Sequence, residues 1–301
     1  LRYTGAFSTR DLYMSQDVLL RFLFDDAPVR GEWLSLDAVW QTVQQRHDYP
    51  PELRALVGEW LAAAVMLRAT LKFEGSLVVQ LQGQGPVSLI VVECAAGMKT
   101  RATARWQGDL TGLSLQEMVG NGVCSILLDP CDGSKPYQGV VPIEGAGVAQ
   151  ILEQYMQRSE QLETRLWLVA SEQSVGGLLL QKMPEQGEQT AEDWSRITQL
   201  ADTVRPDELL TLAGQTLLYR LFHQENLRLL QEDAISFGCA CSREKVENMI
   251  RMLGADEADA IVSEQGEIVS RCEFCGASYV FDAVDVSGIF AAAASGSLHR
   301  H

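Results

Sequence analysis

The sequence is short of positive charge. Its 301 residues include 24 Lys and Arg against 40 Asp and Glu, which gives a formal net charge of −16 at pH 7. A chain this acidic repels phosphate backbones and anionic lipid surfaces. We therefore expect neither a nucleic-acid partner nor a membrane partner.

Long apolar runs are also missing. The run at residues 61–67 (LAAAVML) is far shorter than the roughly 20 apolar residues that a membrane-spanning helix needs. The first residues show no basic segment followed by an apolar run and a cleavage site. These absences predict a cytoplasmic protein. Residues 1–13 carry no periodic pattern and do not enter the predicted fold, which begins at Met14.

The motifs of several enzyme classes are absent. The sequence has no phosphate-binding loop of the G-x-x-x-x-G-K-[ST] type and no G-x-S-x-G nucleophile turn. Residues 145–147 (GAG) precede a predicted helix, but Gln150 stands where a dinucleotide-binding motif needs a third small residue. Only four His are present, and His47 and His223 are most simply structural. We expect no enzyme activity, no catalytic residue and no nucleotide cofactor.

Four of the seven cysteines form two close pairs near the C-terminus, Cys239-x-Cys241 and Cys272-x-x-Cys275. Two thiol pairs, separated by enough chain to fold back between them, can supply all four corners of a tetrahedral Zn²⁺ site. A filled tetrahedron leaves no open position for a substrate. We predict that one Zn²⁺ per chain is bound by these four cysteines.

The same thiols can also react with oxidants. Bound zinc keeps the sulfurs deprotonated and therefore nucleophilic, and Arg243, Lys245 and Arg271 offset the negative charge of the cluster. Each thiol has a candidate resolving partner two or three positions away, so a sulfenic acid can condense to a disulfide. A purely structural zinc site and an oxidant-sensing site both remain open at this point.

The other three cysteines are assigned no function. Cys94 and Cys124 lie in apolar, strand-like runs and are expected to be buried small hydrophobes. Cys131 lies in a turn-rich segment and is expected to be exposed. An odd number of cysteines and a reducing compartment argue against a disulfide scaffold.

Hydrophobic periodicity predicts an α+β core domain over residues 14–183. Apolar residues recur at three- and four-residue intervals after Pro51, on one face of a helix over 51–67. Short alternating runs predict strands, which turns such as 83–86 join into antiparallel sheet. The predicted strands cover 77–82, 87–92, 100–106, 123–128, 137–143, 166–169 and 178–181, and a further helix covers 148–158.

A polar stretch at 184–189 begins a region of different character, which we interpret as a helical linker over residues 184–236. Short helices are marginal without tertiary contacts, so this linker must dock on a neighbour. The predicted helices cover 191–200, 207–212 and 215–222.

Residues 237–290 are predicted to form a small zinc-binding module. Helices are expected over 243–253 and 256–262, followed by a hairpin that carries the second cysteine pair. A module of this size has little core of its own and depends on metal for its fold.

Several motifs in this order resemble those of the 33-kDa redox-regulated heat-shock chaperone family, which are bacterial holdases. The most specific are residues 239–244 (CACSRE) and 272–276 (CEFCG), although Lys245 stands where Arg is expected. The resemblance extends from Met14 to Phe290. Its other motifs are Phe24 and residues 29–32 (VRGE), 47–50 (HDYP), 70–75 (TLKFEG), 80–86 (QLQGQGP), 119–122 (VGNG), 137–139 (YQG), 158–162 (RSEQL) and 208–212 (ELLTL).

The resemblance implies an ATP-independent holdase whose reduced, zinc-bound form is inactive. By the family pattern, oxidation pairs Cys239 with Cys241 and Cys272 with Cys275, releases zinc, and unfolds the module and then the linker. The exposed apolar surface then binds unfolded or oxidatively damaged client proteins, and the active form is a homodimer.

Two alternative functions belong to other protein classes, an enzyme and a binding adaptor. A dithiol oxidoreductase that uses Cys272 and Cys275 needs a free, exposed pair, whereas zinc occupies both sulfurs. A constitutive zinc-ribbon adaptor binds its partner in every redox state. Metal content before and after treatment with peroxide separates all three.

Overall fold

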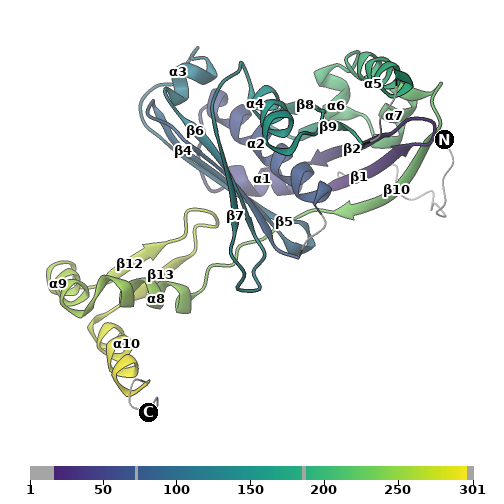
Figure 1. Ribbon diagram of the computed structural model, residues 1–301. Coiled ribbons are helices and arrows are strands. Elements are labelled where there is room, and N and C mark those ends of the chain that lie inside the picture. Colours follow the sequence, from purple (N-terminus) through teal and green to yellow (C-terminus); the bar gives the residue numbers. More distant parts are fainter. Residues whose placement is uncertain (1–16, 72–73, 185–187, 297–301) are drawn as a thin grey trace. The chain divides into compact units, whose positions relative to one another are not determined.

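The computed structural model describes residues 17–71, 74–184 and 188–296 (Figure 1). The chain divides after Gly238 into two compact units. Within the described ranges, no helix has the length and apolar character needed to cross a membrane.

Two sheets form the framework of the N-terminal unit. The first has the strand order β10-β1-β2-β9-β8, and the second has the order β11-β5-β4-β3-β6-β7. All neighbouring strands are antiparallel except β11 and β5. The strands are β1 Val18–Phe24, β2 Val29–Leu36, β3 Ser76–Gln82, β4 Val87–Ala95, β5 Lys99–Trp106, β6 Val123–Asp129, β7 Tyr137–Pro142, β8 Thr164–Ala170, β9 Val175–Lys182, β10 Leu227–Ala234 and β11 Ser236–Phe237.

Helix α2 (Pro51–Thr70) is the centre of the larger hydrophobic core. It contacts β2, β8 and β9 of the first sheet as well as β3, β4 and β5 of the second. Fourteen of its 20 residues are buried, so the predicted single apolar face is wrong. A helix covered on several sides needs apolar residues all round, and the small side chains of Ala62, Ala63 and Ala64 permit that close packing.

The α+β class with antiparallel sheets is confirmed. All seven predicted strands are present as β3 to β9, and the helix over 148–158 is present as α4 (Val148–Tyr155) followed by a π-helical turn, η2 (Met156–Glu160). Strands β1 and β2 were not individually predicted. The unit also contains α1 (Ala38–Gln44), η1 (Ala96–Met98) and α3 (Leu115–Val119).

The three linker helices lie on the first sheet, on the face that carries Phe22, Phe24 and Trp33. Their inward side chains join those residues in a second hydrophobic cluster. Gly214 begins α7 directly over the Trp33 ring, where an added Cβ atom would lie only 2.5 Å from a ring carbon. The helices are α5 Glu188–Ala201, α6 Pro206–Thr211 and α7 Gly214–Phe222.

The interpretation of residues 184–236 as a helical linker is wrong for their last part, over which no individual helix was predicted. Residues 227–234 form β10, which pairs with β1 at the edge of the first sheet. Leu227 and Leu229 are buried on the helix-covered face, and the intervening Arg228 is exposed. This alternation favours a strand, but it is short and its second half, 231–234, is polar or small.

The C-terminal unit is a small helical module around one hairpin. Its predicted helices are confirmed as α8 (Arg243–Leu253) and α9 (Ala255–Gln265), and the hairpin as β12 (Ile268–Arg271) and β13 (Ser278–Phe281). Helix α10 (Ala283–Gly296) follows. The buried core consists of Val246, Ile250, Ala258, Phe281, Val286 and Ile289. Such a small core is a weak source of stability by itself.

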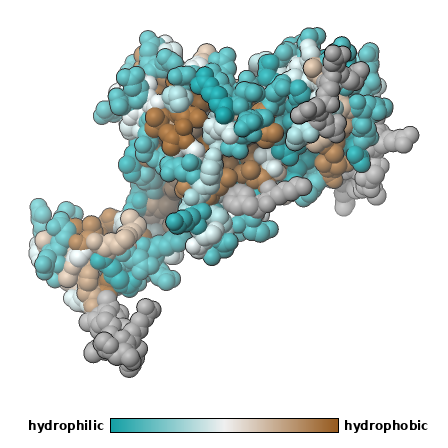
Figure 2. Space-filling model, in the orientation of Figure 1, coloured by the Kyte–Doolittle hydropathy of each residue, from teal (hydrophilic) through white to brown (hydrophobic). Residues whose placement is uncertain are grey.

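Hydrophilic residues cover much of the visible surface of each unit, and each unit also carries apolar patches (Figure 2). The aromatic side chains under the linker contribute little to this surface, because Phe22, Phe24 and Phe222 are each no more than 4% exposed. The linker helices and β10 thus enclose a large part of the apolar surface of the first sheet.

Candidate metal centre

The four paired cysteines come together within the C-terminal unit. Cys239 and Cys241 lie in the segment before α8, and Cys272 and Cys275 lie in the turn between β12 and β13. Their sulfur atoms all lie within 4.8 Å of one another. Two segments about 30 residues apart in the sequence are therefore folded onto one point.

The second pair occupies a tight knuckle. The backbone N–H of Gly276 donates to the Cys272 carbonyl (2.8 Å), and the Cys272 N–H donates to the Ala277 carbonyl (2.9 Å). Gly276 has φ 72°, a left-handed conformation that favours glycine. This turn directs the N–H groups of Phe274 and Cys275 at the Cys272 sulfur. Amide donors of this kind stabilise a thiolate.

The first pair, Cys239 and Cys241, is held by contacts with α8 and β13. Ser242, the next residue, caps α8 by accepting a hydrogen bond from the Lys245 N–H (3.2 Å). The hydroxyl of Tyr279 on β13 donates to the Cys241 sulfur (3.2 Å). This hydrogen bond raises the pKa of Tyr279 to about 12. Tyr279 was not among the predicted site residues, and its only local signal is its place four residues after Cys275.

The donor set fits a tetrahedral ion. A Zn–S bond of about 2.3 Å places the sulfurs of a regular tetrahedron about 3.8 Å apart. The Cys239 and Cys272 sulfurs are 3.6 Å apart, and those of Cys241 and Cys275 are 3.3 Å apart. These separations are far too long for disulfide bonds, and all four cysteines are free thiols.

Burial makes the cluster a poor site for unpaired thiolates. It raises the pKa of Cys272, and together with hydrogen bonds among the thiols it raises the pKa of Cys275 to about 12. Four anionic sulfurs this close repel one another, so without a metal the protonated thiols are favoured. A divalent cation at their centre favours the deprotonated thiolates instead. The chemistry of the donor set therefore favours a thiolate-binding metal ion.

Arg243, one of the three cationic residues expected beside the cluster, has other contacts. The Arg243 guanidinium lies 4.2 Å from the centre of the Phe281 ring, pairs with Asp285 (2.8 Å) and donates to the Val280 carbonyl (2.9 Å). Arg243 thus connects α8 with β13 and α10. Lys245 and Arg271 are exposed.

The remaining cysteines lie where the sequence places them. Cys94 and Cys124 are buried in the second sheet, and burial raises the pKa of each thiol to about 12. Such thiols are poor nucleophiles at neutral pH. Cys131 is exposed in the turn between β6 and β7.

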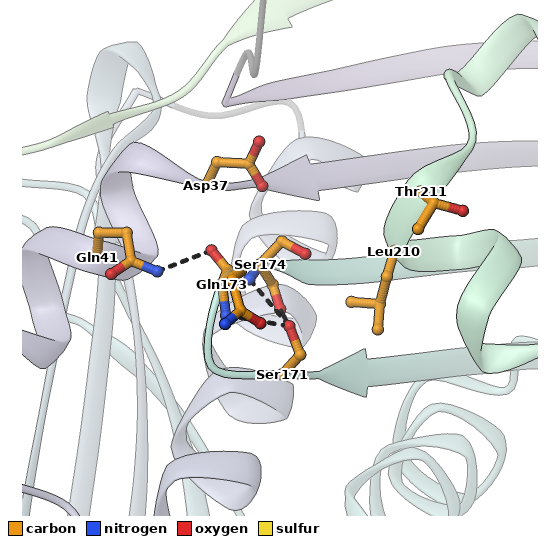
Figure 3. A pocket seen from close by; sticks show the side chains of 7 residues that line it. All are labelled: Asp37, Gln41, Ser171, Gln173, Ser174, Leu210 and Thr211. Atoms are coloured by element: carbon orange, nitrogen blue, oxygen red, sulfur yellow. Dashed lines mark hydrogen bonds between the residues drawn. The ribbon is translucent and has the colours of Figure 1, made fainter.

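A separate pocket of about 610 Å³ lies in the N-terminal unit, where α6 meets the turn between β8 and β9 (Figure 3). Its polar groups hold that turn: the Gln41 amide donates to the Gln173 carbonyl (2.9 Å), and the Ser171 hydroxyl donates to the Ser174 carbonyl (3.0 Å). We assign this pocket no function. It is lined by Asp37, Gln41, Ser171, Gln173, Ser174, Leu210 and Thr211.

Comparison with known proteins identifies the family. The family model described as "Hsp33 protein" matches residues 17–282. The chain belongs to the Hsp33 family. The resemblance inferred from the cysteine pairs and the other motifs is thereby confirmed.

Relatives match over nearly the whole chain. The "33 kDa chaperonin" of Methylobacillus flagellatus is 51% identical over 276 residues, which cover 91% of this chain and 94% of that protein. The protein of the same name from Chromobacterium violaceum is 45% identical with the same coverage. The crystal structure of the 33 kDa chaperonin (HSP33) from Thermotoga maritima superposes with a TM-score of 0.79 at 20% identity, over 93% of this chain and 99% of that one.

Membership of this chaperone family gives the chain a chaperone role, with client proteins as its binding partners. The relatives are named chaperonins and not enzymes. The cysteine cluster of this Hsp33 protein is consistent with metal binding and with thiol oxidation.

Proposed function

We propose that this Hsp33 protein is an ATP-independent holdase that oxidation switches on. The convergence of four free thiols from two segments, in a module with a very small core, carries the proposal. The reduced form binds one Zn²⁺ through Cys239, Cys241, Cys272 and Cys275, and it is inactive. The cytoplasm is the fitting compartment because it keeps such thiols reduced at rest.

When bound, Zn²⁺ keeps the four sulfurs deprotonated and links the two segments that carry them. The knuckle of Cys272 and Cys275 supplies two ligands from a turn already shaped by backbone hydrogen bonds. The segment of Cys239 and Cys241 supplies the other two and is held by the Ser242 cap and the Tyr279 hydroxyl.

Peroxide oxidises each pair in two steps. One thiolate attacks the O–O bond, so one oxygen stays on sulfur as a sulfenic acid and the other leaves as hydroxide. The second thiolate of the pair then attacks that sulfur, and a second hydroxide leaves as the disulfide forms. Two protons complete two waters, and each pair has given two electrons to one peroxide molecule.

The pairing of Cys239 with Cys241 and of Cys272 with Cys275 rests on chain proximity. Sulfur atoms of different pairs also lie close together, at 3.6 Å for Cys239 and Cys272 and at 3.3 Å for Cys241 and Cys275, so the folded geometry does not by itself select this pairing. Once the module opens, however, closing a loop of about 30 residues costs about 2 kcal/mol more entropy than closing one of two or three. Local disulfides are favoured for that reason.

Loss of the ligands unfolds the module. Structural zinc contributes about 10 to 16 kcal/mol to such folds, which equals or exceeds the whole stability of a typical domain. The six buried residues of the module do not replace that contribution. Unfolding then reaches the end of the N-terminal unit directly, because Cys239 follows Gly238, whose N–H donates to the Thr100 carbonyl (3.1 Å).

The linker responds because its last strand and two of its helices are short. Strand β11 has only two residues paired with β5, and α6 and α7 have six and nine residues. Opening of α5 to β10 uncovers the aromatic face of the first sheet and the apolar side of the helices, including Leu209, Leu217 and Phe222. A large apolar patch of this kind binds unfolded chains and favours self-association into the homodimer that we propose as the active form.

Two measurements on one sample test the proposal. Reduced protein should contain one zinc per chain and fail to suppress client aggregation, and peroxide should release the zinc and produce suppression without nucleotide. Cys272→Ser should bind zinc weakly, with Cys131→Ser as the matched control that keeps it. A constitutive adaptor would bind its partner equally well before and after peroxide, and tight, stoichiometric zinc in a Cys239→Ser, Cys275→Ser double variant would refute the ligand assignment.

A further inference from the structure

Tyr279 links the metal centre to the apolar core of the module. Its hydroxyl donates to the Cys241 sulfur at 3.2 Å, across 38 residues of sequence. Its ring is partly buried and packs against the cluster that contains Val246, Ile250 and Phe281. The Tyr279 ring therefore fixes β13 to the apolar core, and the Tyr279 hydroxyl connects β13 to the Cys-x-Cys segment.

The donor to Cys241 differs in kind from those of the second pair. Cys272 accepts from the backbone N–H groups of Phe274 and Cys275, and Cys275 accepts from that of Ala277. Those donors belong to the knuckle turn and are present whenever it is folded. The donor to Cys241 is a side-chain hydroxyl from another element, so a single oxygen atom controls it.

A hydrogen bond to a metal-bound thiolate has two effects. It orients the ligand, and it withdraws electron density from the sulfur, which lowers its nucleophilicity and alters the metal–sulfur bond. We propose that Tyr279 is a positioning residue that retards oxidation of Cys241 and so sets the oxidant level at which the module loses its metal. This role rests on the proposed function, because it concerns the rate of the same switch.

Removal of one oxygen tests the proposal. Tyr279→Phe keeps the ring in the core and deletes only the hydroxyl donor. Zinc released by a fixed excess of peroxide, followed with a chromophoric chelator, should appear about tenfold faster than from the parent protein, a factor taken from the lower end of the 10- to 100-fold loss of metal affinity or activity that follows removal of an outer-shell contact. Ser287→Ala is the control, since it deletes another side-chain hydrogen bond of the module, from the Ser287 hydroxyl to the Ala283 carbonyl (2.8 Å).

A second variant and a spectrum separate electronic tuning from loosened packing. Site-specific 3-fluorotyrosine at position 279 is a stronger donor of nearly unchanged size, so it should slow zinc release relative to the parent. In the cobalt-substituted protein, Tyr279→Phe should shift the sulfur-to-cobalt charge-transfer band to lower energy, and Ser287→Ala should leave it in place.

The outcomes distinguish this inference from the function on which it rests. Absence of zinc, or of peroxide-driven release, in the parent protein defeats the proposed switch itself. Normal binding and release in the parent, with unchanged rates and spectrum in Tyr279→Phe, overturns only the role of Tyr279. Equal acceleration in Ser287→Ala, or faster release with 3-fluorotyrosine, overturns it as well.

Discussion

Substitution of Phe222 by Ala should open the linker without oxidation. Phe222 ends α7 and is 1% exposed, and its ring packs edge-on against Phe24 (centroid distance 5.1 Å) and at a tilt against Phe22 (6.3 Å). Truncation of a buried Phe costs about 3 to 5 kcal/mol. Contacts between the rings account for roughly 0.5 to 1.5 kcal/mol of that loss per pair.

This loss is large compared with the stability of a local segment. Local opening free energies range from near zero up to the global value, which is about 5 to 15 kcal/mol for a typical domain. Since about 1.4 kcal/mol corresponds to a factor of ten, a loss of at least 3 kcal/mol raises the open fraction of α5 to β10 by about a hundredfold or more. Reduced, zinc-bound Phe222→Ala should therefore suppress client aggregation.

Hydrogen exchange and an aggregation assay check this on the same reduced sample, with zinc content measured in parallel. Amides of residues 190–234 should exchange faster, whereas those of α2 stay protected. Tyr219→Ala is the matched control: it lies on the same helix, but its side chain is 62% exposed, so it should change neither readout. An open linker with no gain of activity would refute the view that the linker masks the client-binding surface. Unchanged exchange would refute the conclusion that packing of Phe222 stabilises the docked linker.

Three further predictions use other parts of the molecule. Peptide mapping of oxidised protein should show Cys239 joined to Cys241 and Cys272 joined to Cys275, and dominant links to Cys94, Cys124 or Cys131 would contradict the local pairing. Purified oxidised protein should suppress aggregation equally with and without ATP, since the sequence has no phosphate-binding loop, and dependence on ATP hydrolysis would overturn the holdase assignment. Burial raises the pKa of Glu32 to about 8, so folding favours its protonated form. The free energy of unfolding should therefore fall as pH rises from about 4.5 through about 8. Glu32→Gln should flatten that slope in denaturant titrations carried out at several pH values.

Sequence patterns predicted the grouping of the four paired cysteines and the middle strands because both depend on local spacing. The members of each cysteine pair are only two or three residues apart, and the alternation of β3 to β5 is regular. Tyr279 was not predicted because its hydrogen-bond partner, Cys241, lies 38 residues away in the sequence. Strand β10 was missed because only its first residues alternate, and its pairing with β1 joins segments about 210 residues apart.

The surface on which the linker docks was also beyond the sequence. Short helices with modest apolar faces indicate that a partner is needed, and the pattern does not say which. That partner is the first sheet of the same unit, on the face that carries Trp33, Phe22 and Phe24. Apolar periodicity likewise predicted that α2 has a single buried face. The sequence does not show how many sheets cover a helix, because this is a property of the tertiary fold.

Hydrogen exchange across the oxidation step tests the central claim most directly. Zinc content, aggregation suppression and amide protection should be followed on one sample before and after peroxide. We predict that zinc leaves, that fast exchange spreads from residues 239–290 into 190–234, that α2 stays protected, and that activity appears with the change in the linker. An active, oxidised protein in which residues 190–234 remain as protected as in the reduced form would contradict the account.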